Sequence, residues 1–275
     1  MTPAILFITV FAVLFGLAIG SFLNVVAYRV PAGIPLTRES RCPQCDTGIR
    51  WWQNVPVVSW LALRGRCASC GQRISPRYPI IEAVTAVVFA LVALGLMLPH
   101  PTPGMLTDAG FWGILITLAV FAGLSVALTL IDLDVKRLPD AIVLPGWGAI
   151  VVLLLVTTLV AHLDWWPFLR ALIGGAALFL FYCLIRLISP RGMGGGDVKL
   201  AGLVGTVLGW FGWGALAFGA FAAFLLGGIF GSILLLAGRA KRRSAIPFGP
   251  WIIAGAWVGI VVGEPIGRWY LGFMS

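Results

Sequence analysis

Two groups of side chains in this 275-residue chain have types and spacings that can do chemistry. Only 10 residues are acidic, and two of these, Asp132 and Asp197, stand at the ends of apolar stretches long enough to cross a membrane. A carboxyl at membrane depth is costly and is retained mostly for function. The second group is two C-x2-C pairs, which place four thiols in one polar segment: Cys42, Cys45, Cys67 and Cys70. The carboxyls indicate acid–base chemistry, and the thiols indicate metal binding.

The spacing of Asp132 and Asp197 leaves room for the chain to cross the membrane and return between them. Both carboxyls are therefore expected at the same membrane face. Two carboxyls within a few ångström cannot both ionise easily, so one holds a proton while the other acts as a base. Such a pair titrates as a unit. Isolated interfacial carboxyls and a proton-coupled transporter remain alternatives at this point.

Neighbouring residues compete with Asp132 for a catalytic role. Asp140 follows a proline and precedes an apolar run, so it can equally begin or cap the next helix. Asp134 lies nearer the loop centre, where solvent or the adjacent Lys136 and Arg137 can pair with it. Asp132 directly follows the expected helix and is least explained by solvent. The glycine-rich run 192–196 before Asp197 allows either close approach of a substrate backbone or a flexible connection between helices.

The cysteine spacing is typical of a zinc site, with 21 residues between the two C-x2-C pairs. Four thiolates make a closed tetrahedral site, which has a structural role and no open position for a substrate water. Disulfide or redox use is the alternative, and a reducing cytoplasmic location disfavours it. Cys183 stands alone in an apolar stretch and is expected to be a small buried hydrophobe.

Composition indicates an all-α polytopic membrane protein. Apolar residues make up 60% of the chain and charged residues 11%, and the mean hydropathy is +1.02; a soluble domain has about 25% charged residues. We expect about eight transmembrane helices, with the zinc loop between the first two. Their windows are 5–27, 80–98, 110–131, 141–161, 168–188, 198–214, 215–237 and 248–263. The sixth and seventh meet at an uncharged turn of Gly and Trp. If these two windows form one helix, the chain has seven helices.

Charge placement orients the expected bundle, because short cytoplasmic loops carry the excess of Lys and Arg. The loop after the first helix holds eight arginines, and the loop near residue 105 holds none. Further cations follow the third, fifth and seventh helices: Lys136, Arg137, Arg186, Arg191, Lys199, Arg239, Lys241, Arg242 and Arg243. Both termini are therefore expected outside and both aspartates on the cytoplasmic side. The net charge of +9 then reflects topology and contact with anionic lipid, and no nucleic-acid partner is expected.

The first apolar stretch can be a membrane anchor or a cleaved signal peptide. It lacks a basic segment before it and a small-residue cleavage site, so we expect a retained anchor.

The surroundings of the aspartates resemble a known family. Gly194-Gly195-Gly196-Asp197 matches the GxGD signature of intramembrane aspartic proteases, and residues 131–140 resemble the first aspartate motif of the bacterial prepilin peptidases. More segments resemble this family in the same order and cover nearly the whole chain: 20–29, the two cysteine pairs, 54–56, 63–67, 77–82 and 246–250.

The resemblance implies a bifunctional enzyme of the cytoplasmic (inner) membrane, in type IV pilus or type II secretion assembly. Members cleave the leader of type IV prepilins or pseudopilins after a glycine on the cytoplasmic side. They then methylate the new N-terminal amine with S-adenosylmethionine. The family's catalytic pair falls on Asp132 and Asp197, and its Zn²⁺ ligands fall on the four clustered cysteines. A peptidase without methyltransferase activity is the nearest alternative.

The methyl-donor site is poorly located by residue chemistry. No G-x-G-x-x-G follows a strand, so the site must be built from the cytoplasmic loop and the adjoining helix ends. Weak candidates are Asn24, Gly65 and Glu82. Asn24 and Glu82 can instead simply cap or pair with helix ends, and Gly65 can instead belong to the turn beside the second cysteine pair. Three tryptophans can stack an adenine or form an interfacial aromatic belt: Trp51, Trp52 and Trp60.

Two regions with separate activities are expected. Residues 1–98 hold the first two helices and the four-cysteine zinc loop and are associated with methyl transfer. Residues 99–275 form a six-helix GxGD peptidase region. In another interpretation the zinc loop is a docking module for secretion machinery, and the aspartates are incidental.

Overall fold

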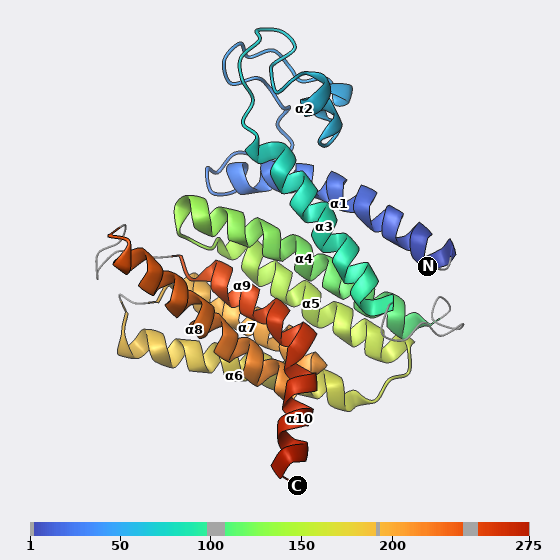
Figure 1. Cartoon of the computed structure of the whole chain (residues 1–275), viewed down its shortest axis with the longest axis vertical. Helices are drawn as coiled ribbons and strands as arrows, with labels where there is room; N and C mark the ends of the chain where they lie inside the picture. The colour runs from blue at the N-terminus through green and yellow to red at the C-terminus, as the bar shows by residue number, and fades with distance from the viewer. Residues whose placement is uncertain (1–2, 98–107, 191–192, 239–246, 275) are drawn as a thin grey trace. The chain divides into compact units, whose positions relative to one another are not determined.

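The computed structural model describes residues 3–97, 108–190, 193–238 and 247–274, and this part of the chain is largely helical (Figure 1). Its only β-structure within these residues is two isolated bridges, Arg41 with Gly48 and Arg66 with Arg73. The elements are α1 (Pro3–Arg29), η1 (Trp51–Asn54), α2 (Val58–Ala62), α3 (Arg77–Met97), α4 (Ala109–Val135), α5 (Asp140–Val160), α6 (Trp165–Ile188), α7 (Gly195–Phe211), α8 (Trp213–Leu236), α9 (Gly249–Val258), η3 (Gly259–Gly263) and α10 (Glu264–Met274).

Seven helical stretches among the described residues are long and apolar enough to cross a membrane. They are α1, α3, α4, α5, α6, α8 and the continuous run Gly249–Tyr270. The sixth expected helix, α7, is not among the seven; its 17 residues are at the short end of the roughly 17–25 that a membrane-spanning helix has. The predicted polytopic all-α fold is confirmed. Gly212 separates α7 from α8, so the sixth and seventh expected helices are two helices and not one.

A few sequence-based expectations fall outside the described residues. These are the end of the second window at Leu98, part of the glycine run at Gly192, and the cations Arg191, Arg239, Lys241, Arg242 and Arg243.

The chain divides into two compact units: residues 1–107 with 118–127, and residues 108–117 with 128–275. In the first unit α1 packs along α3 (Figure 1). A β-carbon at Gly20 would lie 2.7 Å from the Glu82 Cα, so small residues allow the two helices their close approach. The segment between these helices, residues 30–76, carries η1, α2 and all four clustered cysteines, and we refer to it as the tetracysteine loop.

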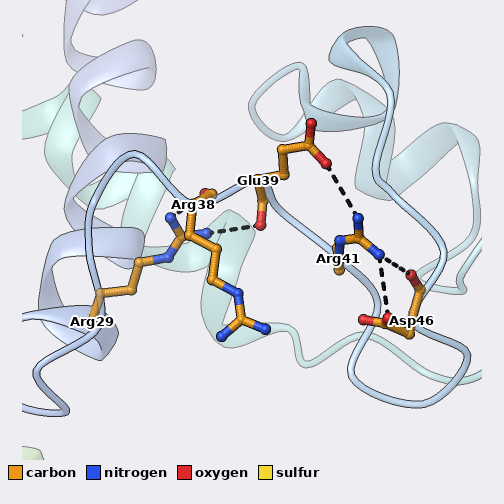
Figure 2. A network of polar contacts seen from close by, with 5 residues as sticks. All are labelled: Arg29, Arg38, Glu39, Arg41 and Asp46. Carbon is orange, nitrogen blue, oxygen red and sulfur yellow. Dashed lines mark hydrogen bonds and ion pairs between the residues drawn. The ribbon is translucent and has the colours of Figure 1, made fainter.

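The tetracysteine loop is tied to α1 by Arg29, the last residue of that helix. This residue is 8% exposed, and its guanidinium donates hydrogen bonds to four backbone carbonyls, of which Figure 2 draws those of Arg38 and Glu39. The acceptors are Pro35, Leu36 (2.9 Å), Arg38 and Glu39 (3.4 Å). A buried guanidinium must find such partners, so the entry to the loop is held in one conformation.

The second unit is built around α7, which packs on α6, α5, α8 and α9. Residue 198 and residues 200–210 of α7 are all buried. The Trp147 indole N–H donates a 2.8 Å bond to Thr206 and ties α5 to α7. Arg170 of α6 donates 2.6 Å bonds to the carbonyls of Gly209 and Trp210, which lack partners within their own helix end. These contacts hold in place the short helix that begins beside Asp197.

Candidate active site and metal centre

Asp132 lies inside α4 and not after it. The helix continues to Val135 and ends at Lys136, whose left-handed backbone (φ 52°) lets its N–H bond the Asp132 carbonyl at 2.9 Å. The expectation that Asp132 directly follows its helix is therefore wrong by one turn. The residue is 4% exposed, so its carboxyl needs a polar partner within the protein.

That partner is the backbone of Gly249, the first residue of α9. The Gly249 N–H donates a 3.0 Å bond to Asp132 Oδ2. A β-carbon at Gly249 would lie 2.8 Å from the same oxygen, so the approach requires glycine. Pro250 follows within the first turn, where its missing N–H costs nothing. In the sequence, residues 246–250 stand out only through their resemblance to the family. A glycine followed by a proline at the start of a helix was the signal that could have indicated an anion-binding helix N-terminus.

Asp197 lies in the first turn of α7 and is half-buried. Its Oδ2 accepts a 3.0 Å bond from the Gly194 N–H, which caps the helix. The glycines before it are packed closely: a β-carbon at Gly196 would lie 2.7 Å from the Leu138 Cβ, and the Arg186 guanidinium lies against Gly195. The glycine run therefore brings the chain after α4 against the start of α7.

The two carboxyls interact electrostatically. Asp197 precedes the apolar part of α7 and lies outside the seven candidate spans. Its pKa is raised to about 6, first by burial and then by the charge of Asp132, against a lowering effect of the Gly194 hydrogen bond. The second unit therefore brings together the two aspartates that the sequence singled out, in surroundings where a proton is retained close to neutral pH.

An aromatic cluster borders the aspartates. Tyr182 of α6 is 1% exposed and interacts electrostatically with Asp197. Its ring centroid lies 5.4 Å from that of Phe224 and 6.4 Å from that of Phe248, the residue before Gly249. Phe224 and Phe248 are themselves 5.4 Å apart. The cluster therefore forms an apolar, aromatic side of the site.

Asp140 and Lys199 form an ion pair, with 2.6 Å between Lys199 Nζ and Asp140 Oδ2. Asp140 is the first residue of α5, as the helix-start interpretation expected. Lys199 stands two positions after Asp197, so the two side chains leave α7 in different directions. The pair joins the start of α5 to the first turn of α7. It was not foreseen, because its members are 59 residues apart.

The four clustered cysteines of the first unit converge on one point. Their sulfur atoms all lie within 4.8 Å of one another, and the Cys42 and Cys70 Sγ atoms are 3.9 Å apart. Tetrahedral Zn–S bonds of about 2.3 Å require sulfur atoms about this far apart. All four cysteines are free, and a disulfide would need about 2.05 Å between sulfurs. The thiolate set therefore fits Zn²⁺, whereas the arrangement does not fit two disulfides.

The two cysteine pairs are held by the same backbone hydrogen bonds. Cys42 N–H bonds the carbonyl of Thr47 at 3.0 Å, and Cys67 N–H bonds that of Gln72 at 2.8 Å. The residue four after the first cysteine is left-handed in both, Asp46 with φ 50° and Gly71 with φ 71°. Such a repeat turns both sulfurs of each pair inward, which explains why local spacing alone predicts the cluster.

The weak candidates for the methyl donor all have structural partners. Asn24 donates to the Tyr78 carbonyl at 3.3 Å, and Glu82 accepts from the Val57 N–H at 2.7 Å, at the start of α2. Gly65 has φ +66° and lies against the Trp60 ring. Trp60 is also engaged, since its indole N–H bonds the carbonyl of Ile74 at 3.2 Å. By contrast, Trp51 is 79% exposed.

Two family descriptions match this chain. The bacterial peptidase A24 N-terminal domain matches residues 14–96, and the type IV leader peptidase family matches residues 119–235. Curated proteins called "Prepilin leader peptidase/N-methyltransferase" are similar over most of their length. That of Aeromonas salmonicida (strain A449) is 37% identical, covering 94% of this chain and 92% of the relative.

Relatives from other bacteria carry the same name. The Pseudomonas putida protein is 37% identical, covering 97% of this chain and 94% of its own, and that of Bacillus subtilis (strain 168) is 32% identical, covering 94% and 96%. No solved structure matches this chain significantly.

Proposed function

Because this chain belongs to the type IV leader peptidase family, a family of aspartic peptidases, we propose that it removes the leader of type IV prepilins or pseudopilins after a glycine and methylates the new N-terminus. The observation that carries the peptidase half is the pairing of Asp132 with Asp197. The charge of one raises the pKa of the other, and each carboxyl is held by a backbone N–H of a glycine.

The pair acts as a general acid and base on a water molecule. The ionised carboxylate takes a proton from water as the water oxygen adds to the scissile carbonyl carbon, and the protonated carboxyl donates to the developing oxyanion. When the carbon–nitrogen bond breaks, the leaving nitrogen receives the proton that the base had taken. No covalent intermediate is needed, and each aspartate ends the turnover in the protonation state in which it began.

Substrate binding uses the chain around the pair. Gly194, the exposed glycine before Asp197, presents no side chain, and the substrate's own glycine at the cleavage point allows its backbone to approach closely. The apolar helix that follows the cut in the substrate lies against the membrane-spanning helices, so binding energy remote from the reacting bond positions that bond.

Methyl transfer is assigned to residues 1–98 and cleavage to residues 99–275. When bound, S-adenosylmethionine supplies the methyl group for the new N-terminal amine. Cys42, Cys45, Cys67 and Cys70 would hold Zn²⁺ as a closed four-thiolate site, which stabilises the tetracysteine loop. The excess of Arg and Lys in alternate loops supports a topology with both termini outside the inner membrane, and with the aspartates and the tetracysteine loop on the cytoplasmic side.

Mass spectrometry of a prepilin incubated with the purified protein and S-adenosylmethionine tests both halves. We expect a mass loss equal to the leader and a gain of one methyl group. Asp132→Asn and Asp197→Asn should each abolish cleavage while the protein stays folded, and Asp134→Asn, at an exposed neighbouring acid, should cleave normally. Substantial cleavage by either of the first two variants contradicts the aspartate pair. An unchanged prepilin mass with the unaltered protein contradicts the peptidase function.

A further inference from the structure

The tetracysteine loop contains an open surface cavity that no step above uses. Its volume is 460 Å³, within the roughly 300–1,000 Å³ of small-molecule sites. It lies between η1 and the residues that flank the first cysteine pair, Cys42 and Cys45. Its lining includes Glu39, Ser40, Ile49, Arg50, Trp51 and Asn54.

The walls of this cavity are held by hydrogen bonds. On the knuckle side, the Ile49 N–H bonds the Ser40 carbonyl at 2.8 Å. The buried Arg29 holds the Glu39 carbonyl, and Arg41 holds the Glu39 carboxylate at 3.5 Å (Figure 2). On the other side, the Gln53 side chain accepts a 3.0 Å bond from the Arg50 N–H. The backbone around the cavity is therefore held in place by these bonds, which lowers the entropic cost of binding.

The geometry of η1 places two side chains together at the cavity. Residues three apart eclipse in a 3₁₀ helix, so Trp51 and Asn54 lie one above the other on the same face. Trp52 is at a different position around the helix, and the Arg50 guanidinium lies 5.1 Å from its ring centroid. The Trp51 ring meets the Trp52 ring edge-on, with 5.7 Å between their centroids, and 79% of the Trp51 surface remains exposed.

These side chains match a ligand in which an adenosine is joined to both a positively and a negatively charged group. An exposed indole offers a face on which a purine stacks. The amide of Asn54 can donate and accept at an adenine edge. The Glu39 carboxylate accepts from ribose hydroxyls or attracts a cation, and the Arg50 guanidinium pairs with a carboxylate. A polyphosphate ligand is disfavoured, because it would place negative charge beside Glu39.

We propose that this cavity binds the adenosine and amino-acid parts of S-adenosylmethionine, with Trp51 stacking on the purine. The proposal rests on the methyl-transfer half of the proposed function. It moves the donor site from the weak candidates Asn24, Gly65 and Glu82 to Glu39, Arg50, Trp51 and Asn54.

Calorimetric binding of S-adenosylhomocysteine, the donor without its methyl group, to the full-length protein in detergent tests this site without relying on activity. Trp51→Ala should weaken binding at least about tenfold, because it removes the stacking surface. Glu39→Gln should weaken binding about threefold or more, because it removes a charge-assisted acceptor. Leu61→Ala is the control, since Leu61 lies in the same loop with 62% of its surface exposed and does not line the cavity, and it should bind within about twofold of the unaltered protein.

Bound zinc is measured on each variant to establish that the tetracysteine loop is intact. If Trp51→Ala loses zinc, the binding measured for Glu39→Gln tests the proposal instead. The Glu39 side chain is 80% exposed, and glutamine has nearly the same shape, so this variant should keep the loop folded. Binding of both variants at the unaltered affinity overturns the proposal. A protein that binds S-adenosylhomocysteine and methylates a prepilin, yet is insensitive at Trp51 and Glu39, contradicts only this location. A protein that cleaves prepilin but neither methylates it nor binds the probe contradicts the methyl-transfer function itself, and this proposal with it.

Discussion

The Gly249 N–H donates a 3.0 Å hydrogen bond to Oδ2 of Asp132, although the two residues are 117 positions apart. Gly249 begins α9, so the carboxyl of Asp132 lies at the positive end of a helix dipole as well as on a backbone donor. The far end of the chain thus sets the position of one proposed catalytic carboxyl.

Gly249→Ala should impair cleavage strongly. The added β-carbon would come within 2.8 Å of Asp132 Oδ2 and must displace the carboxyl or the start of α9. A displacement of about 1 Å at reacting groups costs about a hundredfold in rate, so we expect a fall in kcat of this order with little change in KM. Gly148→Ala is the control, because a β-carbon there meets no atom within 4 Å. Equal kcat values for these two variants would show that the contact has no role in catalysis.

The ion pair between Lys199 and Asp140 should matter more for rate than for stability. Lys199→Met separates the start of α5 from the first turn of α7 and loosens the position of Asp197, so we expect kcat to fall about tenfold. The unfolding free energy should change by about 1 kcal/mol or less, because the two side chains are 32% and 59% exposed.

Exchanging the charges, with Asp140→Lys and Lys199→Asp in one chain, provides the control for this ion pair. The double variant should recover part of the rate that each single variant loses. Losses that simply add in the double variant would argue against a coupled positioning role.

Cleavage should depend on pH through the proton shared by Asp132 and Asp197. The pKa of Asp197 is raised to about 6 by burial and by the neighbouring carboxylate, so the pair loses its retained proton as the pH rises through that value. We expect kcat to decline above about pH 6, because the general acid is lost. A rate that is flat from pH 5 to pH 8, within about twofold, would contradict a carboxyl acting as the general acid.

Stability should follow the same titration. A folded pKa above the ordinary value of about 4 means that stability from this group is full below pH 4 and lost as the pH rises through about 6. The melting temperature of the unaltered protein should therefore fall from pH 4 to pH 7 relative to Asp197→Asn, whose amide does not titrate. Parallel melting curves for the two proteins would show that the Asp197 pKa is not raised.

Zinc should be bound at one ion per chain and should depend on the clustered cysteines. Cys42→Ser removes one of four thiolates, so bound metal should fall to a small fraction and the tetracysteine loop should become sensitive to proteolysis. Cys183→Ser is the control, because Cys183 lies in α6 outside the cluster and should leave the zinc content unchanged. Stoichiometric zinc in the purified Cys42→Ser protein would contradict a four-thiolate site.

Local features of this protein could be predicted from its sequence. The C-x2-C knuckles depend on short-range turns, with Cys42 bonded to Thr47 and Cys67 to Gln72, so their spacing alone indicates the cluster. Helix positions followed from hydropathy, because the membrane forces backbone groups to pair within each segment. The rarity of acids in an apolar chain singled out Asp132 and Asp197.

The partners of those residues were decided by the tertiary structure. Gly249 meets Asp132, and Lys199 meets Asp140, across long stretches of chain whose sequence carries no periodic signal for the contact. The extension of α4 past Asp132 was missed because two aspartates interrupt the apolar run in its last turn, and the expected window therefore stopped at Ile131. Likewise, the sequence does not distinguish Trp51, which borders the cavity, from Trp60, whose indole N–H is hydrogen-bonded to the Ile74 carbonyl. Sequence by itself determined which groups this protein carries and how each helix forms, since these depend on neighbours along the chain. Only the packing of distant segments determined which of those groups meet.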